Sequence, residues 1–206
     1  MSASIAFVNI STDKAADPAS VLGYSKHIAE RLTAEVARRA TGVFVSVRFG
    51  NVLGSRGSML VTFRSQVESG GPLTVTDPDA TRFFMTIPEA VELVIQAAAI
   101  GSRGETLVLD MGQPVSIDQV AKRLAARADR PVRIVYTGLR PGEKCHEVRF
   151  SVGEVDTRPV HPLISHVRVQ ALSVAAVREL QPGEPSTAGT LRDLCSADLS
   201  VAEGLT

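Results

Sequence analysis

The chain has 206 residues, of which 44% are hydrophobic, enough for a sizeable core in one domain or in a main domain with a small lobe. Basic and acidic residues both number 22, so the balanced charge excludes the usual reasons to expect a nucleic-acid partner or an anionic membrane surface. The two cysteines and four histidines show no metal-ligand spacing, and no run is apolar enough to span a membrane. We therefore expect a cytoplasmic protein without a bound metal.

The first part of the chain predicts a strand, a long helix and a second strand. Residues 5–10 and 43–49 are short apolar runs typical of buried strands. Between them, Asp17 as cap and Pro18 as first helical residue predict a helix that continues to about residue 40. Its buried face should repeat every four residues, at Ile28, Leu32 and Val36.

The middle of the chain continues to alternate. A glycine-rich turn is expected at 51–57, helices at 58–68, 88–100 and 117–128, and strands or extended segments at 73–76, 82–85, 105–110 and 132–136. This alternation predicts an α/β fold with a mostly parallel sheet. We assign residues 1–150 to a main domain with a small interleaved lobe, and 151–206 to a C-terminal extension that is partly disordered after about residue 181.

Four segments carry a resemblance to a known family. They are NISTDKAADPASVLGYSK (9–26), RFGNVLGSRGS (48–58), TRFFMTIPEAV (81–91) and GLRPGEK (138–144). In order and approximate spacing they resemble the polysaccharide-biosynthesis nucleotide-sugar 4,6-dehydratases, a branch of the extended short-chain dehydrogenase/reductase family. The resemblance covers about residues 5–150. It implies part of a Rossmann-like, doubly wound parallel sheet with a small substrate-binding lobe.

The resemblance implies a reaction and its acid–base residues. The sugar C4 is oxidised by hydride transfer to NAD or NADP, water is eliminated across C5 and C6, and the hydride returns to C6. Thr12 would bind the C4 hydroxyl, Asp13 would protonate the departing C6 hydroxyl, and Lys14 would remove the C5 proton. All three directly follow a predicted strand, where ligands bind in open α/β sheets.

A second set of residues is implied to face the cofactor. Lys26 would bind the nicotinamide ribose, and Phe49, Gly50 and Asn51 would lie near the nicotinamide and the sugar diphosphate. The wider family has a tyrosine four residues before this lysine, but Leu22 stands there, as an apolar residue does in the membrane-associated branch. The base for C4 oxidation is therefore open between Asp13 and an ordered water.

The remaining implied residues would bind the UDP-sugar. Arginine pairs phosphate oxygens in a bidentate way, and a carboxylate suits the ribose diol. Arg82 and Arg140 would hold the diphosphate and Glu143 the ribose, with Asn51, Ser55 and Arg56 contributing from the glycine-rich turn.

The family's glycine-rich cofactor loop is not found in these 206 residues. We therefore expect the C-terminal portion of such an enzyme, with a possible homodimer or a partner supplying the N-terminal half. Two other functions stay open: a non-catalytic remnant that at most binds a nucleotide sugar, and a nucleotide-sugar epimerase, which would not need Asp13 and Lys14 for elimination.

Overall fold

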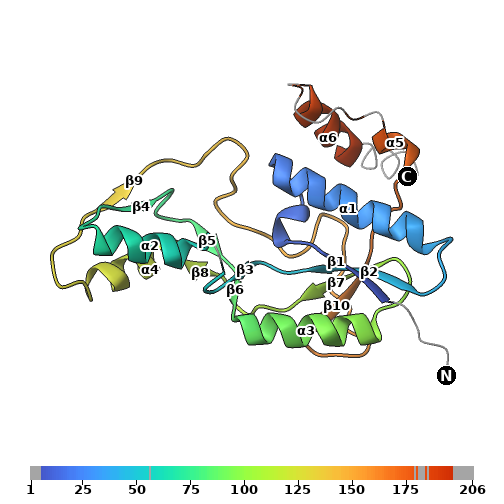
Figure 1. The fold of residues 1–206 in the computed structure, drawn as a ribbon, viewed down its shortest axis with the longest axis horizontal. Helices are drawn as coiled ribbons and strands as arrows, with labels where there is room; N and C mark the ends of the chain where they lie inside the picture. Colours follow the sequence, from blue (N-terminus) through green and yellow to red (C-terminus); the bar gives the residue numbers. More distant parts are fainter. Residues whose placement is uncertain (1–5, 56, 179, 181–183, 185, 197–206) are drawn as a thin grey trace. The chain divides into compact units, whose positions relative to one another are not determined.

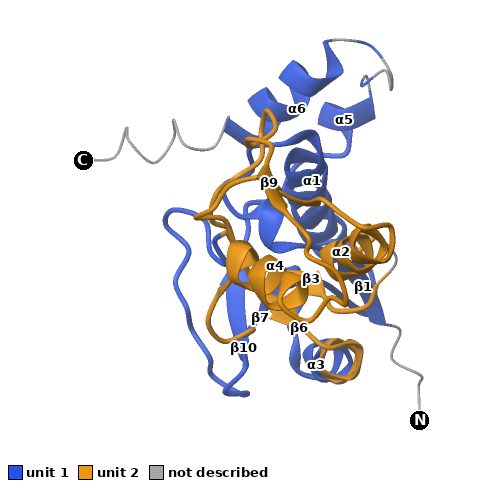
Figure 2. Ribbon diagram, turned by 90° about the vertical axis from the view of Figure 1, so that its left-hand side faces the viewer, with its two compact units in different colours: residues 1–49, 93–110, 148–206 blue, residues 50–92, 111–147 orange. Residues whose placement is uncertain are grey.

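The computed structural model describes residues 6–55, 57–178, 180, 184 and 186–196, which fall into two units (Figure 2). Unit 1 comprises residues 1–49, 93–110 and 148–206, and unit 2 comprises residues 50–92 and 111–147. Each unit buries apolar side chains of its own. Each unit is assembled from segments that are distant in sequence, and residues 148–206 fall in unit 1.

Unit 1 is built on a four-stranded sheet in the order β1-β2-β7-β10. The strands are β1 (Ala6–Ile10), β2 (Val43–Arg48), β7 (Glu105–Leu109) and β10 (Ile164–Arg168). The first three run parallel, and β10 runs antiparallel to β7. The predicted α/β fold with a mostly parallel sheet is confirmed.

Helices cover both faces of this sheet. α1 (Val21–Ala37) lies on one face, and the part of α3 (Ile87–Ile100) from Leu93 onward lies on the other (Figure 1). The strands between them are apolar at their centre, where Val45, Val47 and Leu107 are fully buried. A strand covered on both faces requires such a continuous apolar run.

Helix α1 begins later than the sequence predicted. Ser20, and not Asp17, is the N-cap, because its hydroxyl accepts a hydrogen bond from the Gly23 amide at 3.2 Å. Asp17 instead has a left-handed backbone with φ of 41°. Val36, expected in the buried face, is 39% exposed.

The segment after residue 150, set apart as an extension from the sequence, contributes β10 to the sheet. Two helices follow, α5 (Ala175–Arg178) and α6 (Thr187–Ser196). α6 lies against α1, where the guanidinium of Arg31 donates to the Leu194 carbonyl at 2.7 Å. An ordered helix therefore occupies part of the stretch expected to be partly disordered; residues 181–183, 185 and 197–206 lie outside the described residues.

Unit 2 consists of short strands and two helices. The elements are β3 (Asn51–Val52), α2 (Met59–Glu68), β4 (Leu73–Val75), β5 (Thr81–Arg82), β6 (Phe84–Met85), β8 (Val115–Ser116), α4 (Ile117–Ala125) and β9 (Ile134–Tyr136). β3 pairs with β6, β4 with β9, and β5 with β8. Phe63 of α2, Leu73 and Val75 of β4, and Ile117 and Ala121 of α4 form its core. Ser58 stands at the N-cap position of α2, and Ser116 caps α4 by accepting a hydrogen bond from the Gln119 amide.

Within the described residues, no helix is both long and apolar enough to cross a membrane.

Candidate functional site

The turn after β1 brings three of the predicted catalytic residues together in unit 1. Thr12 caps the short 3-10 helix η1 (Asp13–Ala15). The amide of Ser11 donates to the Val47 carbonyl at 2.8 Å, and the amide of Asp13 donates to the Phe49 carbonyl at 3.0 Å. The turn is therefore anchored to the end of β2, at the sheet edge where α/β proteins bind ligands.

Asp13 is the centre of this turn. Its Oδ1 accepts hydrogen bonds from the Thr12 hydroxyl at 2.9 Å and from the Lys14 ammonium at 2.9 Å. The Asp13 side chain is fully buried, and its Oδ2 has no hydrogen-bond partner among the described residues. A buried carboxyl oxygen without a partner is costly and is typical of a site that a ligand completes. A hydroxyl, a carboxyl and an amine in direct contact can move protons.

A buried network of charged residues contacts the Asp13 turn through Ser11. Glu30 of α1 accepts a hydrogen bond from the Ser11 hydroxyl at 2.5 Å, one residue before Thr12. The Arg48 guanidinium donates to both oxygens of Glu30, at 3.1 and 2.6 Å, and to Glu154 at 2.7 Å. Although burial alone lowers the pKa of Arg48, the charges and hydrogen bonds of Glu30 and Glu154 raise this pKa above its ordinary value. Arg48 therefore stays charged and ties α1 to β2.

Lys26, the predicted cofactor residue, lies on the same helix one turn before Glu30. Its ammonium donates to the carbonyl of Ile10, the last residue of β1, at 3.0 Å. Leu22, one turn earlier, is 53% exposed. Lys26 is thus held at the carboxyl end of β1, and no tyrosine stands one turn before it.

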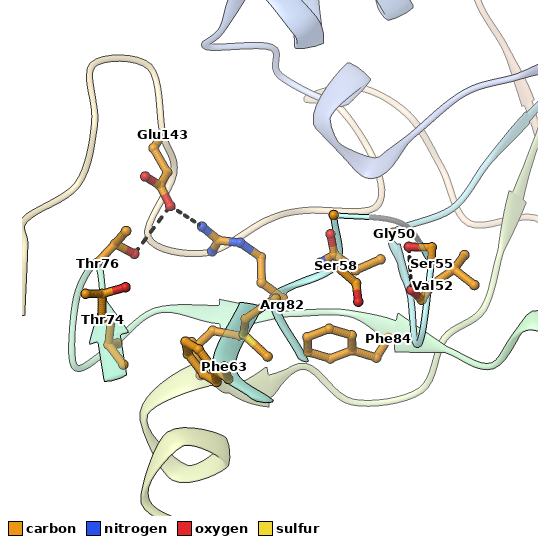
Figure 3. A pocket seen from close by; sticks show the side chains of 15 residues that line it. Gly50, Val52, Ser55, Ser58, Phe63, Thr74, Thr76, Arg82, Phe84 and Glu143 are labelled. Atoms are coloured by element: carbon orange, nitrogen blue, oxygen red, sulfur yellow. Dashed lines mark hydrogen bonds and ion pairs between the residues drawn. The ribbon is translucent and has the colours of Figure 1, made fainter. Parts of the chain in front are cut away.

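Unit 2 contains a cavity of about 450 Å³ (Figure 3). Gly50, Asn51, Ser55, Ser58, Thr74, Thr76, Arg82, Phe84 and Glu143 are among the residues that line it. The volume is in the range of small-molecule sites, roughly 300–1,000 Å³. The lining combines aromatic rings, hydroxyls, one guanidinium and one carboxylate, a composition suited to a polar organic ligand.

The N-terminus of α2 opens onto this cavity. Ser58 is the N-cap by position, yet its hydroxyl makes no capping hydrogen bond. Its Oγ is buried and has no hydrogen-bond partner among the described residues. Helix N-termini present unpaired amides and a partial positive charge, so this end of the cavity favours an anion.

Arg82 and Glu143 face each other across the cavity wall (Figure 3). Arg82 Nη2 donates to Glu143 Oε1 at 3.1 Å, and its Nη1 donates to the carbonyls of Thr81 and Cys145 at 2.8 and 2.9 Å. Glu143 also accepts from the Thr76 hydroxyl at 3.3 Å. The guanidinium is thereby fixed in place, and an Arg in fixed geometry is preorganised for phosphate.

The other predicted substrate residues are only partly brought together. Asn51 and Ser55 line the cavity, and Phe49 of unit 1 contributes its carbonyl to the Asp13 turn. Arg140 is exposed and does not line the cavity, although its amide donates to Glu143 Oε2 at 3.2 Å. Arg56 lies outside the described residues.

Sequence reasoning missed Ser58 as a binding residue and Glu30 with Arg48 as support. Ser58 was read only as the first residue of a helix, a position that does not by itself indicate a ligand. Glu30 and Arg48 are charged residues inside apolar patterns, where periodicity assigns no partner. Only the folded chain places them in contact.

The parallel sheet of unit 1, covered by helices on both faces and ending in polar turns, defines a Rossmann-like α/β protein. The chain belongs to the polysaccharide biosynthesis protein family, whose model matches residues 2–169. It is 48% identical over 167 residues to the capsular polysaccharide biosynthesis protein CapD of Staphylococcus aureus, covering 79% of this chain and 28% of CapD. It is 37% identical over 150 residues to the UDP-glucose 4-epimerase of Rickettsia bellii, covering 71% of this chain and 43% of that enzyme.

Solved structures show the same fold. Pen from Bacillus thuringiensis superimposes with a TM-score of 0.70 at 31% identity, over 78% of this chain and 52% of Pen. The Thermus thermophilus UDP-glucose 4-epimerase in complex with NAD superimposes with a TM-score of 0.57 at 19% identity, over 70% of this chain and 55% of that enzyme. The chain therefore spans about 28% of CapD and about half of each solved neighbour.

Proposed function

We propose that the chain carries the acid–base turn and the sugar-nucleotide site of a nucleotide-sugar 4,6-dehydratase acting on a UDP-N-acetylhexosamine. The observation that carries the proposal is the buried Asp13, touched on one oxygen by a hydroxyl and an ammonium and unpartnered on the other among the described residues. Water elimination needs an acid for the departing hydroxyl and a base for the neighbouring proton, and this turn supplies both.

Each residue of the turn has one role in the proposal. Asp13, in its protonated form, donates a proton from Oδ2 to the departing C6 hydroxyl. Lys14, in its neutral form, accepts the C5 proton at Nζ. Thr12 hydrogen-bonds the C4 hydroxyl through Oγ1. Their mutual contacts at 2.9 Å would let a proton pass back through Asp13 Oδ1 to reset the turn.

A nicotinamide cofactor, when bound, supplies the acceptor and donor of hydride for C4 and C6. The Lys26 ammonium fits the ribose of such a group, because one ammonium has three donors and Ile10 takes one of them. Whether the cofactor is NAD or NADP is set elsewhere in enzymes of this fold, after a strand that precedes these segments. The solved neighbour from Thermus thermophilus has NAD bound.

The cavity in unit 2 is proposed to hold the nucleotide end of the substrate. The α2 N-terminus with Ser58 and the Arg82 guanidinium would bind the diphosphate, and Glu143 would bind the ribose hydroxyls. Glu143 would exchange its contact with Thr76 for the ribose diol. Asn51 and Ser55 would contact the sugar side of the diphosphate.

The kinship to CapD supports a role in surface polysaccharide biosynthesis, and we expect the cytoplasm as the location. The chain spans 28% of CapD, and we include in the proposal a partner that supplies the rest of the cofactor site.

Calorimetric titration of the chain with UDP-N-acetylglucosamine, with and without NAD, tests the binding half of the proposal. We expect Arg82→Gln to weaken binding at least about tenfold, because it removes a charge-assisted contact to phosphate. Arg133→Gln is the matched control, since Arg133 is exposed in the same unit and does not line the cavity. Equal loss in both variants, or no binding by a folded chain, would reject the site. Binding that is indifferent to NAD would leave only a nucleotide-sugar-binding remnant.

Mass spectrometry of the products tests the chemistry. A dehydratase converts the sugar into a product lighter by one water, and Asp13→Asn should lower that rate by about 10²–10⁴-fold. The epimerase alternative is favoured by the 37% identity to the Rickettsia bellii enzyme, and it predicts a product of unchanged mass. Turnover with unchanged mass that survives Asp13→Asn would replace the dehydratase by the epimerase.

A further inference from the structure

A second cavity, of about 590 Å³, lies entirely within unit 1. One face of α1 lines it with Tyr24, His27 and Arg31, which are three and four residues apart. The opposite side comes from α6 and from the residues after β10. This cavity shares no residue with the Asp13 turn or with the cavity of unit 2.

Hydrogen bonds hold the walls of this cavity together. Arg31 is 3% exposed, and its guanidinium donates to the carbonyl of Gln170 at 2.9 Å and to that of Leu194 at 2.7 Å. One side chain of α1 thus holds both the segment after β10 and α6. Two other lining residues are also joined, because the amide of Val152 donates to Asp17 Oδ1 at 3.1 Å.

Two further arginines line the cavity from these two walls. Arg168, the last residue of β10, is exposed, and its guanidinium has no hydrogen-bond partner or ion pair among the described residues. The side chain of Arg192 in α6 is 64% exposed, and within the described part of the chain it makes only one long ion pair, to Asp193 at 3.7 Å. Two guanidiniums from separate elements, each with N–H groups that make no hydrogen bond within the described residues, can both donate to one anion.

The lining carboxylates do not cancel this charge. The lining contains two carboxylates, Asp17 and Glu154, and three arginines. Both Glu154 oxygens already accept hydrogen bonds from Arg48, at 2.7 and 3.2 Å. Tyr24 adds a hydroxyl to the lining. An anionic ligand therefore meets an excess of donors and of positive charge.

We propose that this cavity binds a small molecule bearing a phosphate or carboxylate group, held by Arg168 and Arg192 at a site separate from the proposed sugar-nucleotide site. The volume exceeds that needed for a simple ion and suits a metabolite-sized ligand.

Calorimetric titrations with sodium pyrophosphate and with sodium citrate test the proposal. The reference is the full chain carrying Arg82→Gln, which weakens any phosphate binding in unit 2. To it we add Arg168→Gln with Arg192→Gln, or, as a matched control, Arg103→Gln with Arg178→Gln. These two arginines are exposed in unit 1 and do not line the cavity, so both triple variants have the same net charge. Equal melting temperatures would establish that all variants are folded.

We expect the reference and the control to bind at least one probe saturably and the Arg168/Arg192 variant to bind it at least about tenfold more weakly. Binding of pyrophosphate alone would assign a phosphate-bearing ligand, and binding of citrate alone a carboxylate. Equal affinities in the test and control variants, or no saturable binding of either probe by the reference, would overturn the proposal.

Discussion

Replacing Arg48 with methionine removes the cation from the buried network that supports the Asp13 turn. Arg48 is fully buried and makes two hydrogen bonds to Glu30, at 3.1 and 2.6 Å. Without it, the fully buried Glu30 carboxylate keeps, among the described residues, only the hydrogen bond from the Ser11 hydroxyl. Breaking a buried ion pair from one side costs about 3–5 kcal/mol. For a chain of this size that corresponds to a fall in melting temperature of roughly 6–20 °C.

The double variant Arg48→Met with Glu30→Met separates the interaction energy of the ion pair from the effects of each single substitution. Removing both charges leaves no uncompensated carboxylate at Glu30, and replacing a buried pair by apolar groups is often neutral. Glu154, 11% exposed, can turn towards solvent. We therefore expect the double variant to be more stable than Arg48→Met alone.

Urea unfolding of the wild type, both single variants and the double variant gives the coupling free energy. A coupling of several kcal/mol is expected. The reasoning fails if the effects of the two single variants simply add, or if Arg48→Met costs less than about 1 kcal/mol.

Three further predictions concern stability. Burial lowers the pKa of His27 below its ordinary value, so the folded state binds fewer protons than the unfolded state. Stability is therefore lost as the pH falls from about 6.5 towards the lowered pKa. His27→Gln should flatten this loss in urea unfolding at about pH 5 to 8, the range in which histidine titrates, and an unchanged pH dependence would assign the loss to other groups. Gly101→Ala places a Cβ 2.9 Å from both the Ala97 carbonyl oxygen and a Val45 methyl. Thermal melting should therefore show a loss of about 1–3 kcal/mol in the free energy of unfolding. A neutral effect would mean that the backbone shifts to relieve these contacts. Gly189→Ala in α6 meets nothing within 4 Å and should stabilise that helix by up to about 1 kcal/mol, whereas destabilisation would contradict the described helix.

Local patterns in the sequence determined most of the secondary structure. The strands predicted at residues 43–49 and 105–110 correspond to β2 and β7, and the helices predicted at 58–68 and 117–128 correspond to α2 and α4. These features depend on side chains within a few residues of one another, so a sequence pattern is sufficient to find them. The four family segments likewise identified the polysaccharide biosynthesis family.

The pairing of distant segments was decided only by the tertiary structure. β10 pairs with β7, although more than fifty residues separate the two strands in the sequence. No local pattern specifies this pairing, because any free strand edge offers unpaired backbone groups to a new strand. The start of α1 was predicted at Asp17, but Ser20 is the N-cap and Asp17 has a left-handed backbone.

The candidate sites divide in the same way. The sequence by itself determined that Thr12, Asp13 and Lys14 are neighbours after a strand, because their adjacency is covalent. Their burial, the support by Glu30 and Arg48, and the cavity that joins Ser58 to Arg82 and Glu143 needed the folded chain. The sequence pattern around a charged side chain does not indicate which distant residue it will contact. Buried ion pairs and cavities are therefore properties of the tertiary structure alone.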